Sequence, residues 1–158
     1  AIHVAALKAR PDINCALHSH TRAGMAVSCM QEGLLPLSQQ AGEVRDLVCY
    51  HAYGIADNDP QECEKLGRDL SDKWLMIMHN HGLLSVGRTV GEAFYYLYSL
   101  ENACKVQVDV MASGAQMIIP AQSAMDELAQ YNAPPADGPC DRNCSWTRRN
   151  TGLFFWAP

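Results

Sequence analysis

The sequence from residue 74 to residue 92 reads WLMIMHNHGLLSVGRTVGE, and its pattern predicts two buried strands separated by a polar insert. The continuous apolar run at 74–78 is typical of a buried strand, and the apolar run at 83–86 predicts a second one. Between them, the insert His79-Asn80-His81-Gly82 breaks the hydrophobic pattern. The sequence therefore predicts that two histidines lie between two strands of the core.

A long helix is expected directly after these strands. Thr89 and Glu92 have the spacing of a capping box, in which the two side chains satisfy backbone groups at the start of a helix. Apolar residues then recur every three to four positions until Gly114, which favours the end of a helix. The stripe consists of Ala93, Leu97, Leu100, Cys104, Val108 and Met111. Its length of about 24 residues corresponds to about 36 Å.

The rest of the chain predicts a mixture of helices and strands. Helices are expected at 2–10, at 23–30, from Pro60 to about Leu70 with Asp59 as the N-cap, and after Pro120; strands are expected at 15–17 and 48–53, an extended connection at 33–36, and a loop at 133–150. Periodicity alone therefore supports an α/β protein.

Composition limits the function classes. The chain has 158 residues, of which 48% are hydrophobic, so it can bury the core of one domain. Its net charge of -5, without any cluster of Lys or Arg, argues against nucleic acid as a partner. No apolar run approaches the roughly 18 residues needed to span a bilayer. We expect a soluble, cytoplasmic protein with no membrane partner.

The cysteines support a reducing compartment. Their number is seven, which is odd, and five of them are scattered singly through expected strands and helices. Cys140 and Cys144 form a closely spaced pair in a region rich in Pro, Gly and Asn. The pair could be half of a metal site or a disulfide, but no second pair completes a four-ligand zinc site, so two loop thiols are favoured.

Two His-x-His triplets carry the chemistry. His18 and His20 follow the apolar strand at 15–17, and His79 and His81 follow the strand at 74–78. Residues i and i+2 of a strand point to the same face, so two imidazoles of one triplet can bind one ion. A third histidine from the other triplet would complete a site with three protein ligands, which is typical of catalytic zinc. The competing interpretation is that the four are ordinary core or surface histidines. Burying four imidazoles without hydrogen-bond partners would, however, cost free energy of folding.

The motifs around these triplets resemble those of the class II aldolase/adducin family. The matching segments are His18-Ser19-His20 followed by Thr-Arg-Ala-Gly, Asn80-His81-Gly82-Leu83-Leu84, Gly87-Arg88-Thr89-Val90 and Glu92-Ala93-Phe94, within residues 3–114. The resemblance implies a divalent metal, with zinc first and Mn, Fe or Co as alternatives, held by His18, His20 and His81. His79 would then lie outside the ligand set.

The resemblance also implies a fold and an activity. The fold would be a three-layer α/β/α domain with a mainly antiparallel central sheet, spanning 1–158, and the assembly a homotetramer. The activity would be that of a metal-dependent lyase, which cleaves a carbon-carbon bond of a small hydroxy-carbonyl substrate through a metal-stabilised enediolate. Decarboxylation at the same metal is an alternative. A non-catalytic interaction module, as in adducin, is the alternative from another class.

Some expected residues of the aldolases are absent, so the catalytic residues stay unassigned. The family's glutamate base lies about twenty residues before the first His-x-His, but only seventeen residues precede His18 and none is Glu. The phosphate-binding segments lie further upstream. The chain begins with Ala rather than Met, and we expect it to lack the N-terminal part of the family domain. The family's tyrosine, a proton donor about twenty residues after the His-x-His, is replaced by the segment 36–40, Pro-Leu-Ser-Gln-Gln.

Other residues have weaker claims to a role. Gly82 would allow a close approach of the backbone, and Ser19 and Asn80 could orient an imidazole by hydrogen bonding. Among aromatic and charged residues, the candidates are Tyr50, His51 and Tyr53 near the cleft, Glu43 and Asp46 in a polar turn, Arg148-Arg149, and Trp146 with Phe154-Phe155-Trp156. We expect core packing for the first group, solvated surface for the charged residues, and docking on the core or a neighbouring subunit for the aromatic tail.

Overall fold

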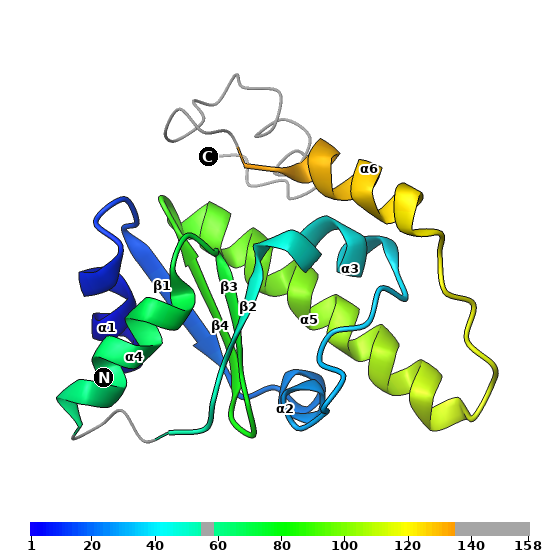
Figure 1. The fold of residues 1–158 in the computed structure, drawn as a ribbon, viewed down its shortest axis with the longest axis horizontal. Coiled ribbons are helices and arrows are strands. Elements are labelled where there is room, and N and C mark those ends of the chain that lie inside the picture. The colour runs from blue at the N-terminus through cyan, green and yellow to red at the C-terminus, as the bar shows by residue number, and fades with distance from the viewer. Residues whose placement is uncertain (55–58, 135–158) are drawn as a thin grey trace.

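A four-stranded sheet forms the middle of the molecule. The computed structural model describes residues 1–54 and 59–134. The strands are β1 (Cys15–Ser19), β2 (Val48–His51), β3 (Leu75–Met78) and β4 (Gly82–Gly87), in the order β1-β4-β3-β2. β4 pairs antiparallel with both β1 and β3, whereas β2 and β3 are parallel (Figure 1). Two of the three pairings are antiparallel, so the expected sheet type is confirmed.

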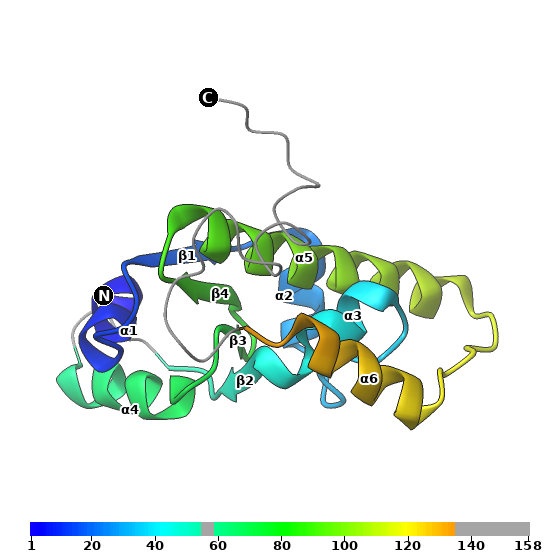
Figure 2. The same cartoon turned by 90° about the horizontal axis from the view of Figure 1, so that it is seen from above.

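Helices cover both faces of the sheet, which confirms the three-layer architecture (Figure 2). One face carries α1 (Ile2–Ala9) and α4 (Pro60–Leu70). The other carries α2 (Arg22–Ser28), α3 (Gln39–Val44) and the long α5 (Val90–Ser113). The 3-10 turn η1 (Arg45–Leu47) directly follows α3, and α6 (Gln122–Asn132) packs on α3. None of the helices in the described residues is long and apolar enough to span a bilayer.

Strand alternation divides the core between the two faces. On β3, Leu75 and Ile77 pack against α2 and α5, whereas Met76 and Met78 face α1 and α4. All four are at most 1% exposed. Successive residues of a strand point to opposite faces, so the continuous apolar run in the sequence reflects a strand that is covered on both sides.

Several elements begin or end at different residues than expected. β3 and β4 form where the two apolar runs predicted strands, but Trp74 lies just outside β3. β2 ends at His51 rather than at residue 53. The polar turn expected around Glu43 and Asp46 was wrong, because Glu43 lies in α3 and Asp46 in η1. Ser38 is the N-cap of α3, and its side chain accepts a hydrogen bond from a backbone N–H three residues later.

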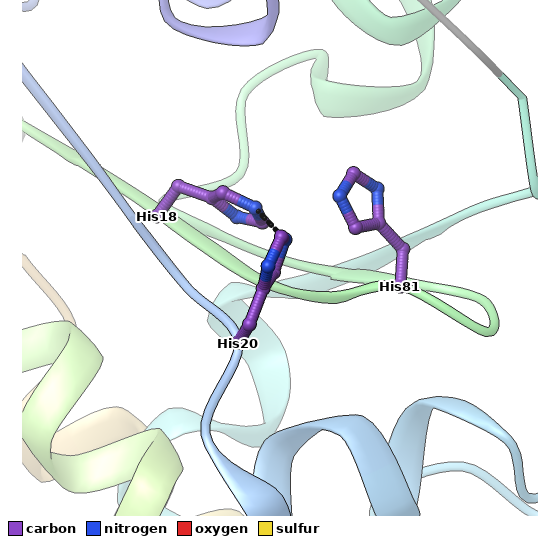
Figure 3. A group of neighbouring side chains, drawn as sticks. All are labelled: His18, His20 and His81. Atoms are coloured by element: carbon purple, nitrogen blue, oxygen red, sulfur yellow. Dashed lines mark hydrogen bonds between the residues drawn. The ribbon is translucent and has the colours of Figure 1, made fainter.

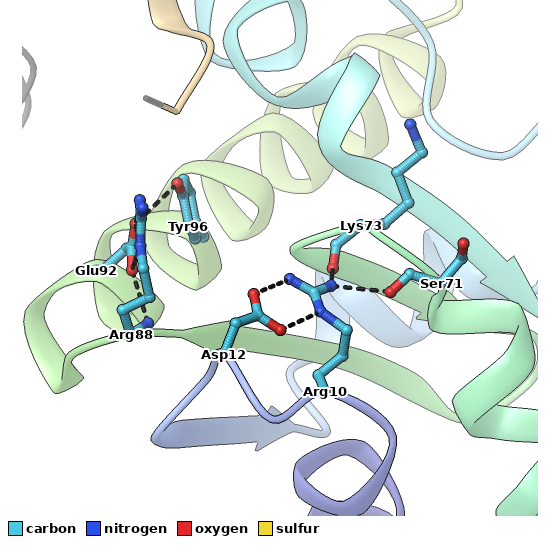
Figure 4. A network of polar contacts seen from close by, with 7 residues as sticks. All are labelled: Arg10, Asp12, Ser71, Lys73, Arg88, Glu92 and Tyr96. Atoms are coloured by element: carbon cyan, nitrogen blue, oxygen red, sulfur yellow. Dashed lines mark hydrogen bonds and ion pairs between the residues drawn. The ribbon is translucent and has the colours of Figure 1, made fainter. Parts of the chain in front are cut away.

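The start of α5 departs from a standard capping box. Thr89 Oγ1 accepts the backbone N–H of Glu92 as predicted, at 3.1 Å. The Glu92 carboxylate, however, accepts the backbone N–H of Arg88 at 2.7 Å, where a capping box would use that of Thr89. It also binds the Arg88 guanidinium (Figure 4). That guanidinium lies 4.9 Å from the ring centroid of Trp74. At its other end α5 stops at Gly114, whose φ of 67° is in the left-handed region.

Candidate metal centre

The end of β1 and the start of β4 bring three histidines together. His18 belongs to β1, His20 follows that strand, and His81 immediately precedes β4 (Figure 3). Strand pairing places Ser19 opposite Leu83, so the two histidine segments lie side by side. At Gly82 a Cβ atom would lie 2.4 Å from the Ser19 carbonyl oxygen. The close approach predicted for Gly82 is therefore confirmed.

The three imidazoles converge on one spot. One ring nitrogen from each of His18, His20 and His81 lies within 4.8 Å of the other two. Ring centroids are 4.4 Å apart for His18 and His20, 4.9 Å for His18 and His81, and 4.8 Å for His20 and His81. In the described part of the chain no other group of three His, Cys, Asp or Glu side chains converges in this way.

Hydrogen bonding fixes the His18 ring. Its Nδ1 lies 2.7 Å from the Leu83 carbonyl oxygen, which can only accept, so Nδ1 carries the proton. Its Nε2 then offers a lone pair toward the group and lies 2.6 Å from His20 Nε2. Four ligands at tetrahedral angles and 2.0 to 2.1 Å from zinc would be about 3.3 Å apart, so these two rings need to separate by about 0.7 Å. The donor set otherwise suits a divalent ion of the zinc type.

The electrostatics favour a neutral imidazole at His18. Burial lowers the pKa of His18, and the neighbouring His20, His81 and His3 lower it further, although the Leu83 carbonyl opposes the change. The ordinary pKa of His is already near 6.5, so His18 is neutral at pH 7. Neutral imidazole is the form that binds metal ions, and His18 is therefore ready to act as a ligand.

His79 and the polar neighbours of the triplets lie outside this group. His79 Nδ1 is 3.2 Å from the Ser28 carbonyl oxygen, and the ring stacks on Tyr50 with 5.6 Å between centroids. Ser19 Oγ is buried and has no hydrogen-bond partner among the described residues. The prediction that Ser19 orients an imidazole was wrong, because the Leu83 carbonyl does so. Asn80 adopts a left-handed φ of 57° in the turn, and its side chain bonds no described imidazole.

A second polar cluster adjoins the centre. His51 is 4% exposed, and its ring is held between Asp69, at 2.7 Å from Nδ1, and Glu62, at 3.0 Å from Nε2. Together with Tyr53 and His81, His51 lines a cavity of about 10 Å³, the size of one water molecule. Core packing was expected for Tyr50, His51 and Tyr53, and it is confirmed for His51 alone, because Tyr50 and Tyr53 are 41% and 62% exposed. Tyr53 lines this small cavity together with His51, and Tyr50 stacks on His79. Cys140, Cys144, Trp146, Arg148-Arg149 and 154–156 lie outside the described residues.

One histidine near the centre was not expected from the sequence. His3, on α1, has its ring centroid 6.2 Å from that of His18, in an edge-on arrangement. The signal was present in the order of elements. A helix of eight residues rises about 12 Å and a strand of five about 16 Å, so a helix that turns back into a strand places its first residues near the strand's end.

Comparison with known proteins agrees with this geometry. The family model of the class II aldolase and adducin N-terminal domain matches residues 1–108. An aldolase class 2 protein of Pseudomonas aeruginosa, named only by its family, is 46% identical over 77% of this chain and 47% of its own length. Alpha-adducin of Mus musculus is 46% identical over 71% of this chain but only 15% of its own length. The chain thus spans at most about half of these relatives.

Solved structures give the same assignment. An aldolase II superfamily protein from Pseudomonas syringae superposes with a TM-score of 0.80 at 38% identity, covering 87% of this chain and 55% of that one. An L-fuculose 1-phosphate aldolase from Glaciozyma antarctica superposes with a TM-score of 0.69 at 28% identity, covering 82% and 49%. The family resemblance and the fold that it implies are both confirmed. The chain belongs to the class II aldolase and adducin family.

Proposed function

We propose that this chain is the metal-binding part of a metal-dependent, aldolase-type lyase. The observation that carries the proposal is the convergence of His18, His20 and His81, with ring nitrogens within 4.8 Å. Three protein ligands leave a coordination position open for substrate, as in catalytic zinc sites. Membership of a family that includes aldolases supports the same activity. The substrate would be a small hydroxy-carbonyl compound.

The roles of the residues follow from their chemistry. His18, His20 and His81 would hold the ion as neutral ligands, which leave its double positive charge undiminished. A divalent cation would supply Lewis-acid stabilisation of negative charge that develops on the substrate oxygens. The Leu83 carbonyl keeps the His18 proton on Nδ1, so that Nε2 stays available. An all-imidazole set suits zinc, and Mn, Fe and Co are the alternatives.

The segment at 36–40 limits the substrate. It has no tyrosine where the resemblance to sugar-phosphate aldolases expects a proton donor, and Ser38 there serves instead as the N-cap of α3. General acid or base assistance is worth about 100- to 10,000-fold in rate. We therefore propose a hydroxy-carbonyl substrate other than fuculose phosphate, and expect weak cleavage of fuculose phosphate itself.

Two other functions fit the same family. Decarboxylation would use the same ion to stabilise the charge left when carbon dioxide departs. A non-catalytic interaction module is supported by the 46% identity with alpha-adducin. The three histidines favour the enzyme, since a module without metal chemistry has no need for a convergent ligand set.

A ligand-binding experiment separates these functions. We expect the metal-loaded protein to bind acetohydroxamate, which offers two adjacent oxygens, and to lose this binding when the metal is removed. Calorimetric titration measures it. Assays for aldol cleavage and for carbon dioxide release on a panel of hydroxy-carbonyl acids and ketones then distinguish the two enzymatic functions. A metal-loaded protein that binds no hydroxamate would favour the interaction module.

We also propose a homo-oligomer, with a tetramer as the state implied by the family resemblance. Val90, Phe94 and Tyr98 are spaced four residues apart along α5 and are 69%, 50% and 46% exposed. The last two rings stack, with 6.2 Å between centroids. Such an apolar stripe supports contact between subunits. Light scattering at micromolar concentration should give a multiple of 17.4 kDa, and a single-chain mass would contradict the proposal.

A further inference from the structure

His3 supplies a fourth imidazole beside the candidate metal centre. Its ring meets that of His18 edge-on, at an interplanar angle of 76° and a centroid distance of 6.2 Å. The three converging rings are only 4.4 to 4.9 Å apart, and the nitrogens of His3 are not part of their group. His3 therefore flanks the ligand set without belonging to it.

The fold holds His3 in this place. Ala6 and Ala5 of α1 are 0% and 5% exposed and pack among the residues of α4 and the sheet. His3 lies three residues before Ala6, so its exposed side chain stands at the border of the buried face of α1. α1 lies beside β1 (Figure 2), and the contact between the His3 and His18 rings places the N-terminal end of α1 near the end of β1.

The imidazole of His3 is available to a ligand. The residue is exposed, and neither ring nitrogen has a hydrogen-bond partner among the described residues. An imidazole carries at least one N–H donor, whether it is neutral or protonated. By contrast, both nitrogens of the buried His51 are already bound by carboxylates. His3 is thus an unused donor next to three converging imidazoles, which would leave one coordination position of a bound ion open.

We infer that His3 is a substrate-binding residue, whose ring N–H donates a hydrogen bond to an oxygen of the ligand at the metal centre. The inference rests on the proposed function, because it needs an ion held by the three converging histidines. It specifies the substrate as one with an anionic or carbonyl oxygen within reach of His3 as well as of the ion. His3 makes no contribution to holding the metal itself.

The test compares three variants in the metal-loaded protein. His3→Phe keeps a ring against His18 but removes the N–H donor, and His3→Gln restores a donor. Lys8→Ala, also exposed on α1 but at its other end, is the matched control. Calorimetry measures zinc binding first and acetohydroxamate binding to the zinc-loaded protein second.

We expect zinc affinity to stay within about twofold for every variant, because none removes a ligand. Hydroxamate binding should weaken about 10- to 100-fold in His3→Phe, the value of one hydrogen bond to a charged group, and should be largely restored in His3→Gln. Lys8→Ala should bind as the wild type does.

The contradicting results are distinct. Unchanged hydroxamate affinity in His3→Phe would overturn the role of His3 and leave the metal centre standing. A parallel loss of zinc would make His3 a ligand or a structural support instead. A wild-type protein that binds zinc but no hydroxamate would also overturn the inference. Failure of the wild type to bind zinc would overturn the proposed function together with it.

Discussion

Replacing Glu92 with Ala should destabilise the fold strongly. The Glu92 carboxylate is 6% exposed and its partner Arg88 is 7% exposed. The Glu92 carboxylate accepts hydrogen bonds from the Arg88 backbone N–H at 2.7 Å, from Arg88 Nη2 at 2.5 Å and from the Tyr96 hydroxyl at 3.4 Å. Glu92→Ala leaves a buried guanidinium without its counter-charge, which costs about 3–5 kcal/mol. A domain with about 5–15 kcal/mol of stability would lose a large share of it.

A second ion pair in Figure 4 provides the matched control. Asp12 binds Arg10 at 2.7 Å but is 51% exposed. In Asp12→Ala the Arg10 guanidinium would keep its hydrogen bonds to the carbonyl oxygens of Ser71 and Lys73, at 2.9 and 2.8 Å. Exposed pairs are worth about 0–1 kcal/mol, so this variant should lose less than about 1 kcal/mol.

Urea unfolding followed by circular dichroism measures both effects, with the m-value as a check on two-state behaviour. The double variant Arg88→Met with Glu92→Leu removes both buried charges and should be more stable than Glu92→Ala alone. A loss below about 1 kcal/mol in Glu92→Ala, or equal losses for Glu92→Ala and Asp12→Ala, would refute the reasoning that burial decides the value of these pairs.

Three further predictions concern the site and the core. Ser19→Ala should leave metal affinity unchanged and raise or maintain the urea midpoint, because it removes a buried hydroxyl without a partner; a loss of metal affinity would show that Ser19 orients a ligand after all. Gly82→Ala should weaken metal binding and stability, because its Cβ would meet the Ser19 carbonyl oxygen at 2.4 Å. Gly91→Ala, whose Cβ has its nearest neighbour at 4.0 Å, should be neutral or slightly stabilising in the same metal-titration and urea-unfolding assays. Burial raises the pKa of Cys104 to about 12, so this thiol stays protonated at pH 8 and should react with iodoacetamide far more slowly than the exposed Cys29; equal labelling by mass spectrometry would contradict its burial.

Strong local patterns made most elements predictable from the sequence. The apolar runs before and after residues 79–82 gave β3 and β4, and the periodic stripe with its terminal Gly114 gave all 24 residues of α5. Helix α3, only six residues long, was not predicted, because it has no apolar stripe of useful length and depends on its Ser38 cap and on packing against α5 and α6.

The site was predictable only in part. Spacing put His18 and His20 on one face of a strand, and the family resemblance, not the spacing, selected His81 over His79. The roles of Ser19 and Leu83 could not be read from the sequence, because they depend on which backbone carbonyl the antiparallel register brings next to His18. His3 was overlooked, although a short helix that turns back into β1 already places the start of α1 near His18.

The central claim is that His18, His20 and His81 hold one divalent ion, and metal stoichiometry tests it most directly. Elemental analysis of purified protein after zinc loading and dialysis should give about one ion per chain for the wild type. His81→Ala should abolish stoichiometric metal, because it removes one of three converging ligands. His79→Ala should retain it, because that ring bonds the Ser28 carbonyl instead. Full occupancy in His81→Ala, or loss of the ion in His79→Ala but not in His81→Ala, would contradict the account.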